Sequence, residues 1–482
     1  MTVSALSADF YELTMMQGYY LTKNNPYVVF DMFYRSNPFN GGYVVFAGIN
    51  DLLKRIELFT FSKSDIEFLR SLNRFDNSFL NYLADFRFTG TIYAVDEGTI
   101  VFPGEPLIRV EGTMLEAQLI EGILLNTINY QSLIATKASR VYQASAQGEI
   151  MEFGLRRAQG PDGAISASRA AYIGGCSATS NTLAGKVFNI PVAGTMAHSW
   201  VMSFDSELES FRAFADIYPN HSVLLIDTYD TLGSGIENAI IVGQELKKKG
   251  KSIGVRIDSG DLSYLSREIR KKLDDAGLSD CKIYASNDLN EEIIETLVRD
   301  GVPIDSWGVG THLVTGGSQS SLNGVYKLAG RRLDDGSWLP TMKVSNSFEK
   351  TTTPGKKQLW RFVDAQGNSL ADLITLEDEK LDFTNDLVFY HPFSEADFFT
   401  MKKSRFVKAI PLLKCVMSEG KRLAVNVKLQ KIQKHVQESL ATFHSTHKRL
   451  INPHLYKVSL SQELKRIKTQ LAIEGRKRVN AD

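Results

Sequence analysis

The chain has 482 residues, of which 43% are hydrophobic and 23% charged, a composition typical of a globular protein with two or three domains. Basic and acidic residues both number 55, and this formal net charge of zero argues against a nucleic-acid or membrane-binding surface. The three cysteines (Cys176, Cys281 and Cys415) are far apart in the sequence, which indicates neither a disulfide framework nor a zinc site.

The amino-terminal region, residues 1 to about 130, begins without the basic start and long apolar core of a signal peptide. No apolar run reaches the length of a membrane span, and we expect a cytoplasmic protein. Hydrophobic patterns predict strands over Tyr27–Arg35, Tyr43–Ala47, Gly90–Ala94 and Gly98–Val110, and helices over Asn50–Leu58, Ser64–Leu72 and Asp76–Arg87.

The central region alternates short apolar runs with amphipathic stretches. The runs predict strands at 148–157, 190–197, 222–230, 252–261, 281–288 and 306–313, and the stretches predict helices over Ser166–Phe188, Glu207–Tyr218, Gly235–Lys249, Leu262–Ala276 and Glu291–Asp300. Such alternation predicts a parallel α/β sheet. Because every strand ends in polar residues or glycine and no GxGxxG follows the first strand, we expect an irregular α/β barrel rather than an open dinucleotide-binding sheet.

The carboxyl-terminal region contains short strands such as Trp360–Val363 and then a lysine-rich helical tail from His447 on. Within this tail, Glu463–Glu474 has the pattern of a solvated amphipathic helix. We therefore expect an α+β flanking domain that is built from both chain ends, residues 1–130 and 331–482, around a barrel domain of residues 131–330.

A histidine between small residues marks the segment VAGTMAHSWVMSF (192–204), where His198 lies between Ala197 and Ser199. An imidazole can accept and pass on a phosphoryl group or a proton near neutral pH, and small neighbours leave room for an anionic partner. On its own the motif is more typical of a hydrogen-bonded core histidine. The polar motifs at neighbouring strand ends favour a functional role.

Arginines and carboxylates follow two of the other predicted strands. Arg156 and Arg157 stand before a glycine loop and suit phosphate or carboxylate ligands, although a salt-bridged surface pair is the alternative. Asp227 and Asp230 lie near the end of the strand predicted at 222–230. In a barrel, such positions converge on the face where catalytic sites form.

The run VRIDSGDL (255–262) brings a cation and two carboxylates to a tight turn. Arg256 suits an anion, and Asp258 suits ribose hydroxyls or a divalent metal. Ser259 or Asp261 could instead cap the following helix.

Closely spaced glycines occur in WGVGTHLVTGG (307–317). Gly308, Gly310 and the hydroxyl of Thr311 could form a backbone cradle for phosphate, or the glycines could serve packing alone.

As a set, these motifs resemble nicotinate phosphoribosyltransferases of the type II phosphoribosyltransferase fold. The resemblance runs nearly end to end, with Trp307 standing where phenylalanine is expected. It is carried by DFYELTM (9–15), FGLRRAQGPDG (153–163), GTMAHS (194–199), IDTYDT (226–231), VRIDSGDL (255–262), YASNDLNE (284–291), WGVGTHLVT (307–315) and NPHLYKVSLS (452–461).

The resemblance implies that nicotinate attacks phosphoribosyl pyrophosphate to give nicotinate mononucleotide and pyrophosphate, coupled to ATP hydrolysis. It implies that ATP phosphorylates His198, and that Thr195, Arg256 and Tyr11 bind nicotinate, with Tyr11 coming from the neighbouring subunit of a homodimer. The other implied residues lie near the sugar, the phosphates and Mg²⁺ (or Mn²⁺). They are Arg157, Ser286, Asn287, Gly308, Gly310 and Thr311 for the phosphoribosyl group and phosphates, with Asp227 and Asp258 as catalytic residues and candidate metal ligands.

The chemistry agrees with this resemblance, because bond cleavage at the ribose requires positioning and charge stabilisation rather than a strong base. By the resemblance, the neutral Asn181 stands where nicotinamide-specific relatives have an aspartate, which favours nicotinate. Nicotinamide, quinolinate and a non-enzymatic scaffold are alternatives. An aldolase-type barrel is disfavoured, since no strand-end lysine and no histidine–carboxylate cluster is found.

Overall fold

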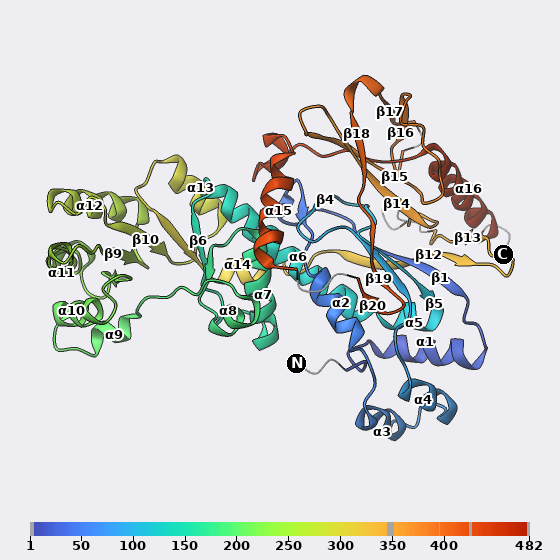
Figure 1. Cartoon of the computed structure of the whole chain (residues 1–482), viewed down its shortest axis with the longest axis horizontal. Helices are drawn as coiled ribbons and strands as arrows, with labels where there is room; N and C mark the ends of the chain where they lie inside the picture. Colours follow the sequence, from blue (N-terminus) through green and yellow to red (C-terminus); the bar gives the residue numbers. More distant parts are fainter. Residues whose placement is uncertain (1–3, 345–350, 395, 424–426, 480–482) are drawn as a thin grey trace. The chain divides into compact units, whose positions relative to one another are not determined.

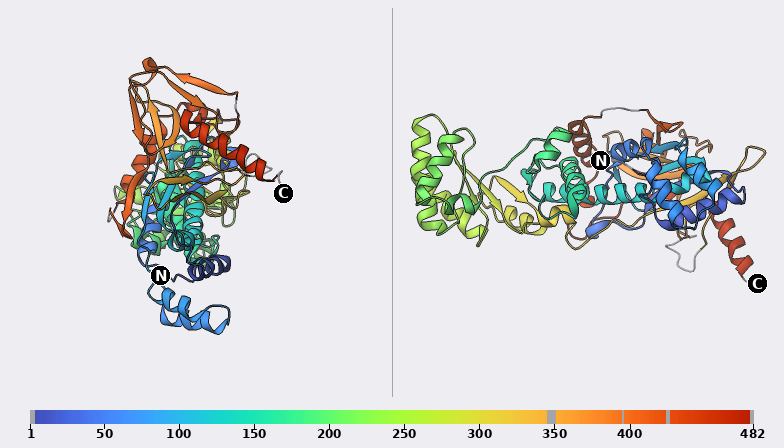
Figure 2. Two further views of the ribbon diagram at one scale, coloured as in Figure 1. Left: turned by 90° about the vertical axis from the view of Figure 1, so that its right-hand side faces the viewer. Right: turned by 90° about the horizontal axis from the view of Figure 1, so that it is seen from below.

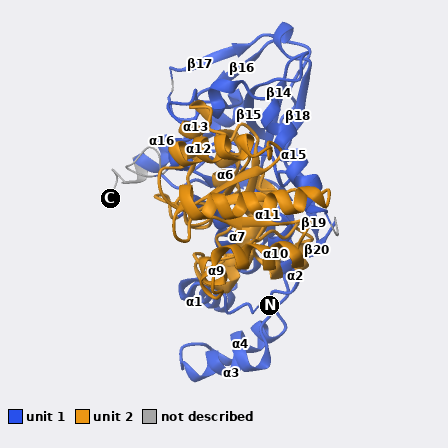
Figure 3. Ribbon diagram, turned by 90° about the vertical axis from the view of Figure 1, so that its left-hand side faces the viewer, with its two compact units in different colours: residues 1–133, 321–482 blue, residues 134–320 orange. Residues whose placement is uncertain are grey.

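The structure, a computed structural model, describes residues 4–344, 351–394, 396–423 and 427–479 (Figure 1). Its internal contacts divide the chain into two compact units (Figure 3). Unit 1 contains residues 1–133 and 321–482, and unit 2 contains residues 134–320. Over the described ranges, no helix is both long and apolar enough to cross a membrane.

Unit 2 is built on a six-stranded parallel sheet with the order β7-β6-β11-β10-β9-β8. The strands are β6 Glu149–Glu152, β7 Ala178–Thr179, β8 Val223–Leu225, β9 Gly254–Ile257, β10 Lys282–Ser286 and β11 Ser306–Val309. The helices are α7 Gly160–Gly174, α8 Thr182–Phe188, α9 His198–Met202, α10 Glu207–Ile217, α11 Ile236–Lys248, α12 Leu262–Asp275, α13 Glu291–Arg299 and α14 Thr311–Thr315. Helix α11 contacts both α10 and α12, and the three helices lie together beside the strands, in green in Figure 2.

The strands of unit 2 form where the sequence is apolar and β-branched. Val255, Ile257 and Ile283 are fully buried, as expected for a parallel sheet with helices on its faces. Among the described residues no hydrogen bonds join β7 to β8, so the sheet is not closed by its ladders. The fold is mixed α/β, and five of the six predicted strands are confirmed over shorter ranges than expected.

Two predictions between residues 160 and 197 are wrong. The helix predicted over Ser166–Phe188 is two helices separated by β7, because α7 ends at Gly174 and is followed by Gly175, whose φ of 129° favours glycine. Helix α8 then begins after Asn181, whose side chain caps it. The strand predicted at 190–197 is irregular chain with one parallel bridge at Val192, since Pro191 and Gly194 disfavour a continuous ladder.

Unit 1 contains two larger sheets, with the orders β13-β12-β1-β5-β3-β19-β20 and β17-β16-β21-β15-β14-β18, and a small sheet β2-β4. The first has β1 Tyr27–Tyr34, β3 Thr91–Ala94, β5 Ile108–Thr113, β12 Gly324–Arg332, β13 Trp338–Pro340, β19 Lys414–Ser418 and β20 Lys421–Arg422. The second has β14 Lys357–Val363, β15 Ser369–Leu376, β16 Leu387–Tyr390, β17 Phe398–Met401, β18 Lys408–Pro411 and β21 Val458–Leu460, and the small sheet has β2 Val44–Val45 and β4 Ile100–Val101.

The helices of unit 1 come from both ends of the chain. They are α1 Phe10–Leu21, α2 Ile49–Glu57, α3 Lys63–Ser71, α4 Asn77–Ala84, α5 Met114–Leu119, α15 Leu429–Ala441 and α16 Gln462–Val479, together with the first part of α6 Glu121–Ala144. Most of the predicted elements before residue 130 are confirmed. The strand predicted over Gly98–Val110 is two strands, because a turn at Pro103 and Gly104 interrupts it.

The predicted solvated helix of the tail is only partly correct. Helix α16 covers the predicted range, but Leu464 is fully buried and Lys468 nearly so. Burial lowers the pKa of Lys468 to about 7, and its ammonium group has the Thr353 hydroxyl at 3.3 Å. One face of α16 is therefore part of the core of unit 1.

Candidate active site

The carboxyl ends of β8, β9 and β10 are neighbours in the sheet of unit 2. Because parallel strands bring these ends to one edge, the residues that follow them can meet there. Asp227 follows β8, Arg256 and Asp258 lie at the end of β9, and Ser286 ends β10. Hydrogen bonds connect all of these residues.

The Asp227 carboxylate is buried and joins two loops. Its Oδ2 accepts hydrogen bonds from the Asp258 amide at 2.9 Å and from the Ser259 hydroxyl at 2.6 Å. Its Oδ1 has no hydrogen-bond partner among the described residues. A buried, unpaired carboxylate oxygen is costly, so this atom is suited to bind a cation or a proton donor.

His198 is the first residue of α9, and its side chain is 41% exposed. The Nδ1 atom and the Thr228 hydroxyl are 3.1 Å apart, and Nε2 lies 3.9 Å from Asp227 Oδ1. When Nδ1 donates its proton to Thr228, Nε2 retains its lone pair. An imidazole in this state can act as a nucleophile toward phosphorus.

Arg256 is held at several points and is largely buried. Its Nε donates to the Ser286 hydroxyl at 2.8 Å, and its Nη1 donates to the Thr195 hydroxyl at 3.1 Å. The guanidinium also lies 5.6 Å from the centre of the Phe153 ring, and Ser286 donates in turn to Asp258 at 2.6 Å. A fixed guanidinium beside a hydroxyl is suited to bind a carboxylate.

The other residues of the predicted phosphate site differ in their surroundings. Gly308 lies within β11, where an added Cβ would come to 2.7 Å from the Phe153 ring. Gly310 precedes α14, which begins at Thr311. Asn287 is exposed directly after β10, with a φ of 142°, and Arg157 is exposed in the turn after β6. The glycine at 308 is therefore required for packing, whether or not its neighbours bind phosphate.

Three further residues have structural roles at the strand ends. Glu152 is fully buried and accepts hydrogen bonds from Gly154 N, from Ser168 at 2.8 Å and from Thr179 at 2.5 Å. Thr228 and Ser259 bind His198 and Asp227 as described above. Thr228 and Ser259 each stand next to a predicted aspartate, and Glu152 belongs to the same strand-end motif as Arg157.

Two predicted residues do not belong to this cluster. Tyr11 lies on α1 of unit 1, where its ring is 46% exposed. Asn181 is in unit 2, but its side chain is buried and bonded to Ala184 N and the Ser168 hydroxyl. Its amide therefore already has protein partners.

Asp227 and Asp258 are the candidate ligands for a divalent cation. Within the ranges that the structure covers, no group of three or more His, Cys, Asp or Glu is arranged to hold a metal. Mg²⁺ usually takes one or two carboxylates together with substrate phosphates and water, and the unpaired Oδ1 of Asp227 is a ligand of that kind. Asp227 and Asp258 therefore fit a metal that arrives with a phosphorylated substrate.

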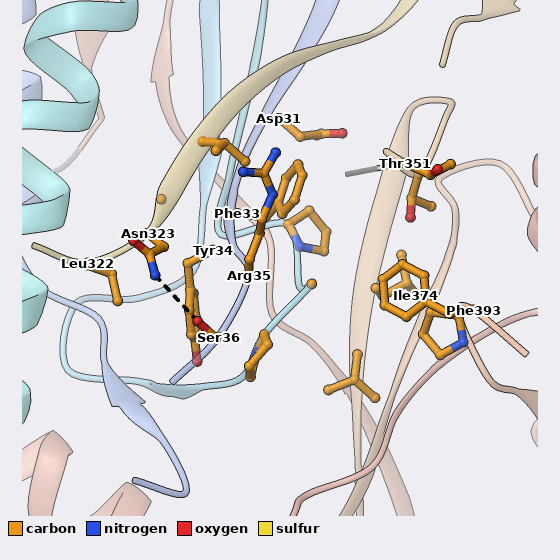
Figure 4. Close-up of a pocket in the computed structure, with 18 of the residues that line it drawn as sticks. Asp31, Phe33, Tyr34, Arg35, Ser36, Leu322, Asn323, Thr351, Ile374 and Phe393 are labelled. Atoms are coloured by element: carbon orange, nitrogen blue, oxygen red, sulfur yellow. Dashed lines mark hydrogen bonds between the residues drawn. The ribbon is translucent and has the colours of Figure 1, made fainter. Parts of the chain in front are cut away.

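A separate cavity of about 780 Å³ lies in unit 1 (Figure 4). Asp31, Arg35 and Lys357 supply its charged lining, and Asn323 donates a hydrogen bond to Ser36 at its wall. The Lys357 ammonium forms an ion pair with Asp31 at 2.5 Å. None of the predicted site residues is among the residues that line this cavity.

Comparison with known proteins places the chain in a family. Family models described as the nicotinate phosphoribosyltransferase N-terminal domain, the nicotinate phosphoribosyltransferase family and its C-terminal domain match residues 6–129, 149–329 and 356–468. A nicotinate phosphoribosyltransferase of Bacillus subtilis is 40% identical over 99% of this chain and 97% of its own length. One of Caenorhabditis elegans is 38% identical over 96% of this chain and 92% of its own length.

A solved structure supports the same assignment. The crystal structure of human nicotinic acid phosphoribosyltransferase matches 96% of this chain and 99% of its own with a TM-score of 0.85 and 30% identity. Fold and site thus define an enzyme that transfers a phosphoribosyl group. The chain belongs to the nicotinate phosphoribosyltransferase family.

Proposed function

We propose that this chain forms nicotinate mononucleotide and pyrophosphate from nicotinate and phosphoribosyl pyrophosphate, and that ATP hydrolysis is coupled to the transfer through His198. Membership of the family supports the transfer itself. The observation that carries the coupling is the geometry of His198, which has Thr228 at Nδ1 and an exposed ring.

The coupling step begins with Nε2 of His198. Nε2 forms a bond to the γ-phosphorus of ATP, and the bond from that phosphorus to the bridging oxygen breaks, so that ADP leaves. Donation from Nδ1 to Thr228 supports the positive charge that develops on the ring. Water later takes the phosphoryl group from the histidine and regenerates the imidazole.

Arg256 and Thr195 would bind nicotinate. The two side chains are already hydrogen-bonded to each other. The guanidinium would bind the carboxylate, and the pyridine nitrogen would then attack the anomeric carbon as the bond to pyrophosphate breaks. Tyr11 of a second copy would stack on the ring. This contribution requires the homodimer that we propose as the working form.

The leaving pyrophosphate develops negative charge that must be stabilised. Asp227 and Asp258 would hold Mg²⁺ or Mn²⁺, which supplies positive charge to the phosphate oxygens when bound. Arg157, Ser286, Asn287, Gly308, Gly310 and Thr311 make up the proposed phosphoribosyl and phosphate site. Ser286 would act partly through Arg256 and Asp258, to which it is bonded.

We infer that the sheet of unit 2 is an irregular, incompletely closed barrel, since the bridge between Thr179 and Val192 adds a further parallel neighbour beyond β7. Residues 131–330 would then form the catalytic domain, flanked by residues 1–130 and 331–482. Cytoplasmic location is the expected setting for these phosphorylated substrates.

The test follows mononucleotide formation from nicotinate or nicotinamide, with phosphoribosyl pyrophosphate and Mg²⁺, in the presence and absence of ATP. We expect product from nicotinate, with a lower KM when ATP is present. His198→Ala should abolish the ATP-dependent gain and leave slow transfer at high substrate concentration. Full ATP stimulation in His198→Ala would refute the phosphohistidine, and product from nicotinamide alone would overturn the substrate assignment.

A further inference from the structure

A small cavity of about 90 Å³ lies beside α16 in unit 1, and we call it the α16 cavity. It is lined by α16, by the chain before β14 and by the chain after β16, and none of the predicted site residues is part of its lining. Thr351, Pro392 and Phe393 line both this cavity and the larger one, so the two cavities adjoin (Figure 4).

The charged lining of the α16 cavity is basic. Lys465, Lys468 and Arg476 line it from one face of α16, and no Asp or Glu is among its described lining residues. The acidic residues of this helix, Glu463 and Glu474, accept hydrogen bonds from neighbours on the helix instead. The wall of the cavity therefore carries positive charge and no negative charge.

Lys468 is the lining residue that most lacks a partner. It is only 6% exposed, and among the described residues its ammonium group has one hydrogen-bond acceptor, the Thr353 hydroxyl at 3.3 Å. The same nitrogen lies 4.7 Å from the centre of the Phe393 ring. An ammonium group has three N–H donors, so two of them have no acceptor in the protein. A buried charge in this state is costly unless an anion pairs with it.

The groups around Lys468 do not supply that anion. Lys465 donates to the backbone carbonyls of His391 at 3.1 Å and Ser394 at 3.0 Å, which hold its ammonium group in place. Lys357 is already paired with Asp31 at 2.5 Å. Burial and then the charges of Lys465 and Lys357 lower the pKa of Lys468, as expected where cations are close together. An anion that enters the cavity would therefore meet ammonium groups that are already positioned.

We propose that the α16 cavity binds a small tetrahedral oxyanion of the size of inorganic phosphate, with Lys468 as its main ligand and with Lys465 and Arg476 beside it. The bound oxygens supply the acceptors that Lys468 lacks and offset the repulsion between the cations. Thr351 and Thr469 also line the cavity and add hydroxyl donors. The volume of about 90 Å³ admits a few waters or one such ion, but not a nucleotide. This inference does not depend on the proposed function.

Titration calorimetry of the full chain with inorganic phosphate tests the site, at pH 7 and at an ionic strength held constant with chloride. Phosphoribosyl pyrophosphate and Mg²⁺ are kept saturating, so that the proposed phosphate site after β11 is filled. We expect one phosphate to bind per chain in a saturable way. The absence of saturable binding overturns the proposal, and AMP that binds as tightly as phosphate overturns the assignment to a small free ion.

Three variants locate the phosphate. Lys468→Met keeps the length of the side chain without its charge and should raise the phosphate Kd about 10- to 100-fold, the range for hydrogen bonds to a charged group. Arg476→Gln, at an exposed residue, should raise the Kd up to about fivefold. Lys434→Met, at an exposed lysine of α15, is the control and should have no effect. The same Kd in Lys468→Met and in the unmodified chain overturns the proposal.

Urea denaturation separates loss of the anion site from loss of the fold. In phosphate-free buffer, Lys468→Met should not lower the urea midpoint, because it removes a buried charge that has no counter-charge. Phosphate should raise the midpoint of the unmodified chain, but not that of Lys468→Met. A marked fall in the midpoint of Lys468→Met without phosphate would show that the protein satisfies this ammonium group by itself, which contradicts the proposal.

Discussion

Polar side chains are used differently in the buried sheets of unit 1 and at the strand ends of unit 2. In unit 1, Arg361 donates from Nε and Nη2 to both oxygens of Asp372, and Tyr456 donates to the same carboxylate at 3.0 Å. In unit 2, Asp227 keeps one oxygen unpaired, and the His198 ring is open to solvent. Polar groups that form hydrogen bonds with one another stabilise the fold. Polar groups without a protein partner can bind a substrate and react with it.

Breaking the buried ion pair between Arg361 and Asp372 should have the largest effect on stability. Asp372→Asn leaves the Arg361 guanidinium buried without its counter-charge, and we expect a loss of about 3–5 kcal/mol in the free energy of unfolding. Urea denaturation measures this loss. The nicotinate KM of the folded fraction should not change, and a substantial rise in that KM would contradict the division of roles.

A surface pair provides the control for that measurement. Asp386 and Lys402 form an exposed ion pair at 2.9 Å. Because solvent screens both groups, Asp386→Asn should leave the urea midpoint unchanged. A loss equal to that of Asp372→Asn would show that burial is not what distinguishes the two pairs.

Removing the proposed carboxylate ligand should affect binding more than stability. Arg256→Ala should raise the nicotinate KM about 10- to 100-fold, the range for a hydrogen bond to a charged group. The urea midpoint should shift much less than in Asp372→Asn. Arg267→Ala, at an exposed arginine on α12, is the control, and an unchanged KM in Arg256→Ala would move the nicotinate site elsewhere.

The smallest effect is expected from the hydroxyl that supports the histidine. Thr228→Val keeps the shape of the side chain but removes the partner of His198 Nδ1, so ATP stimulation should fall about fivefold, or about 1 kcal/mol. Transfer without ATP should be unaffected. Equal losses with and without ATP would assign Thr228 to the transfer step and not to phosphorylation.

Much of unit 2 could be predicted because five of its strands coincide with short apolar runs that end in polar residues or glycine, whereas β7 lies within a range predicted to be helical. The strand β9 and the motif after it are the clearest case, since Val255 and Ile257 are buried while Asp258 emerges at the edge. Helix α6 was missed because apolar residues are buried over most of its length, from Ile128 to Val141. A helix covered on many sides lacks the one-sided pattern that marks an amphipathic helix.

The site was predictable as a set of residues but not as a network. Neighbouring strands explain why Arg256 meets Ser286, but the bond from Arg256 to Thr195 depends on how an irregular segment returns to the sheet. The unpaired oxygen of Asp227 and the burial of Asn181 are likewise products of three-dimensional packing. Residue type and spacing do not encode such contacts.

The assembly of unit 1 from both chain ends has a consequence for the order of folding during synthesis. In the first sheet, Val28 of β1 pairs with Arg331 of β12, and Tyr93 of β3 pairs with Cys415 of β19. The ribosome therefore releases all of residues 134–320 before either partner strand exists, and unit 2 can form its own sheet first. Until then β1 lacks one neighbour, and nascent chains that stall before residue 324 should be the ones that depend most on chaperones.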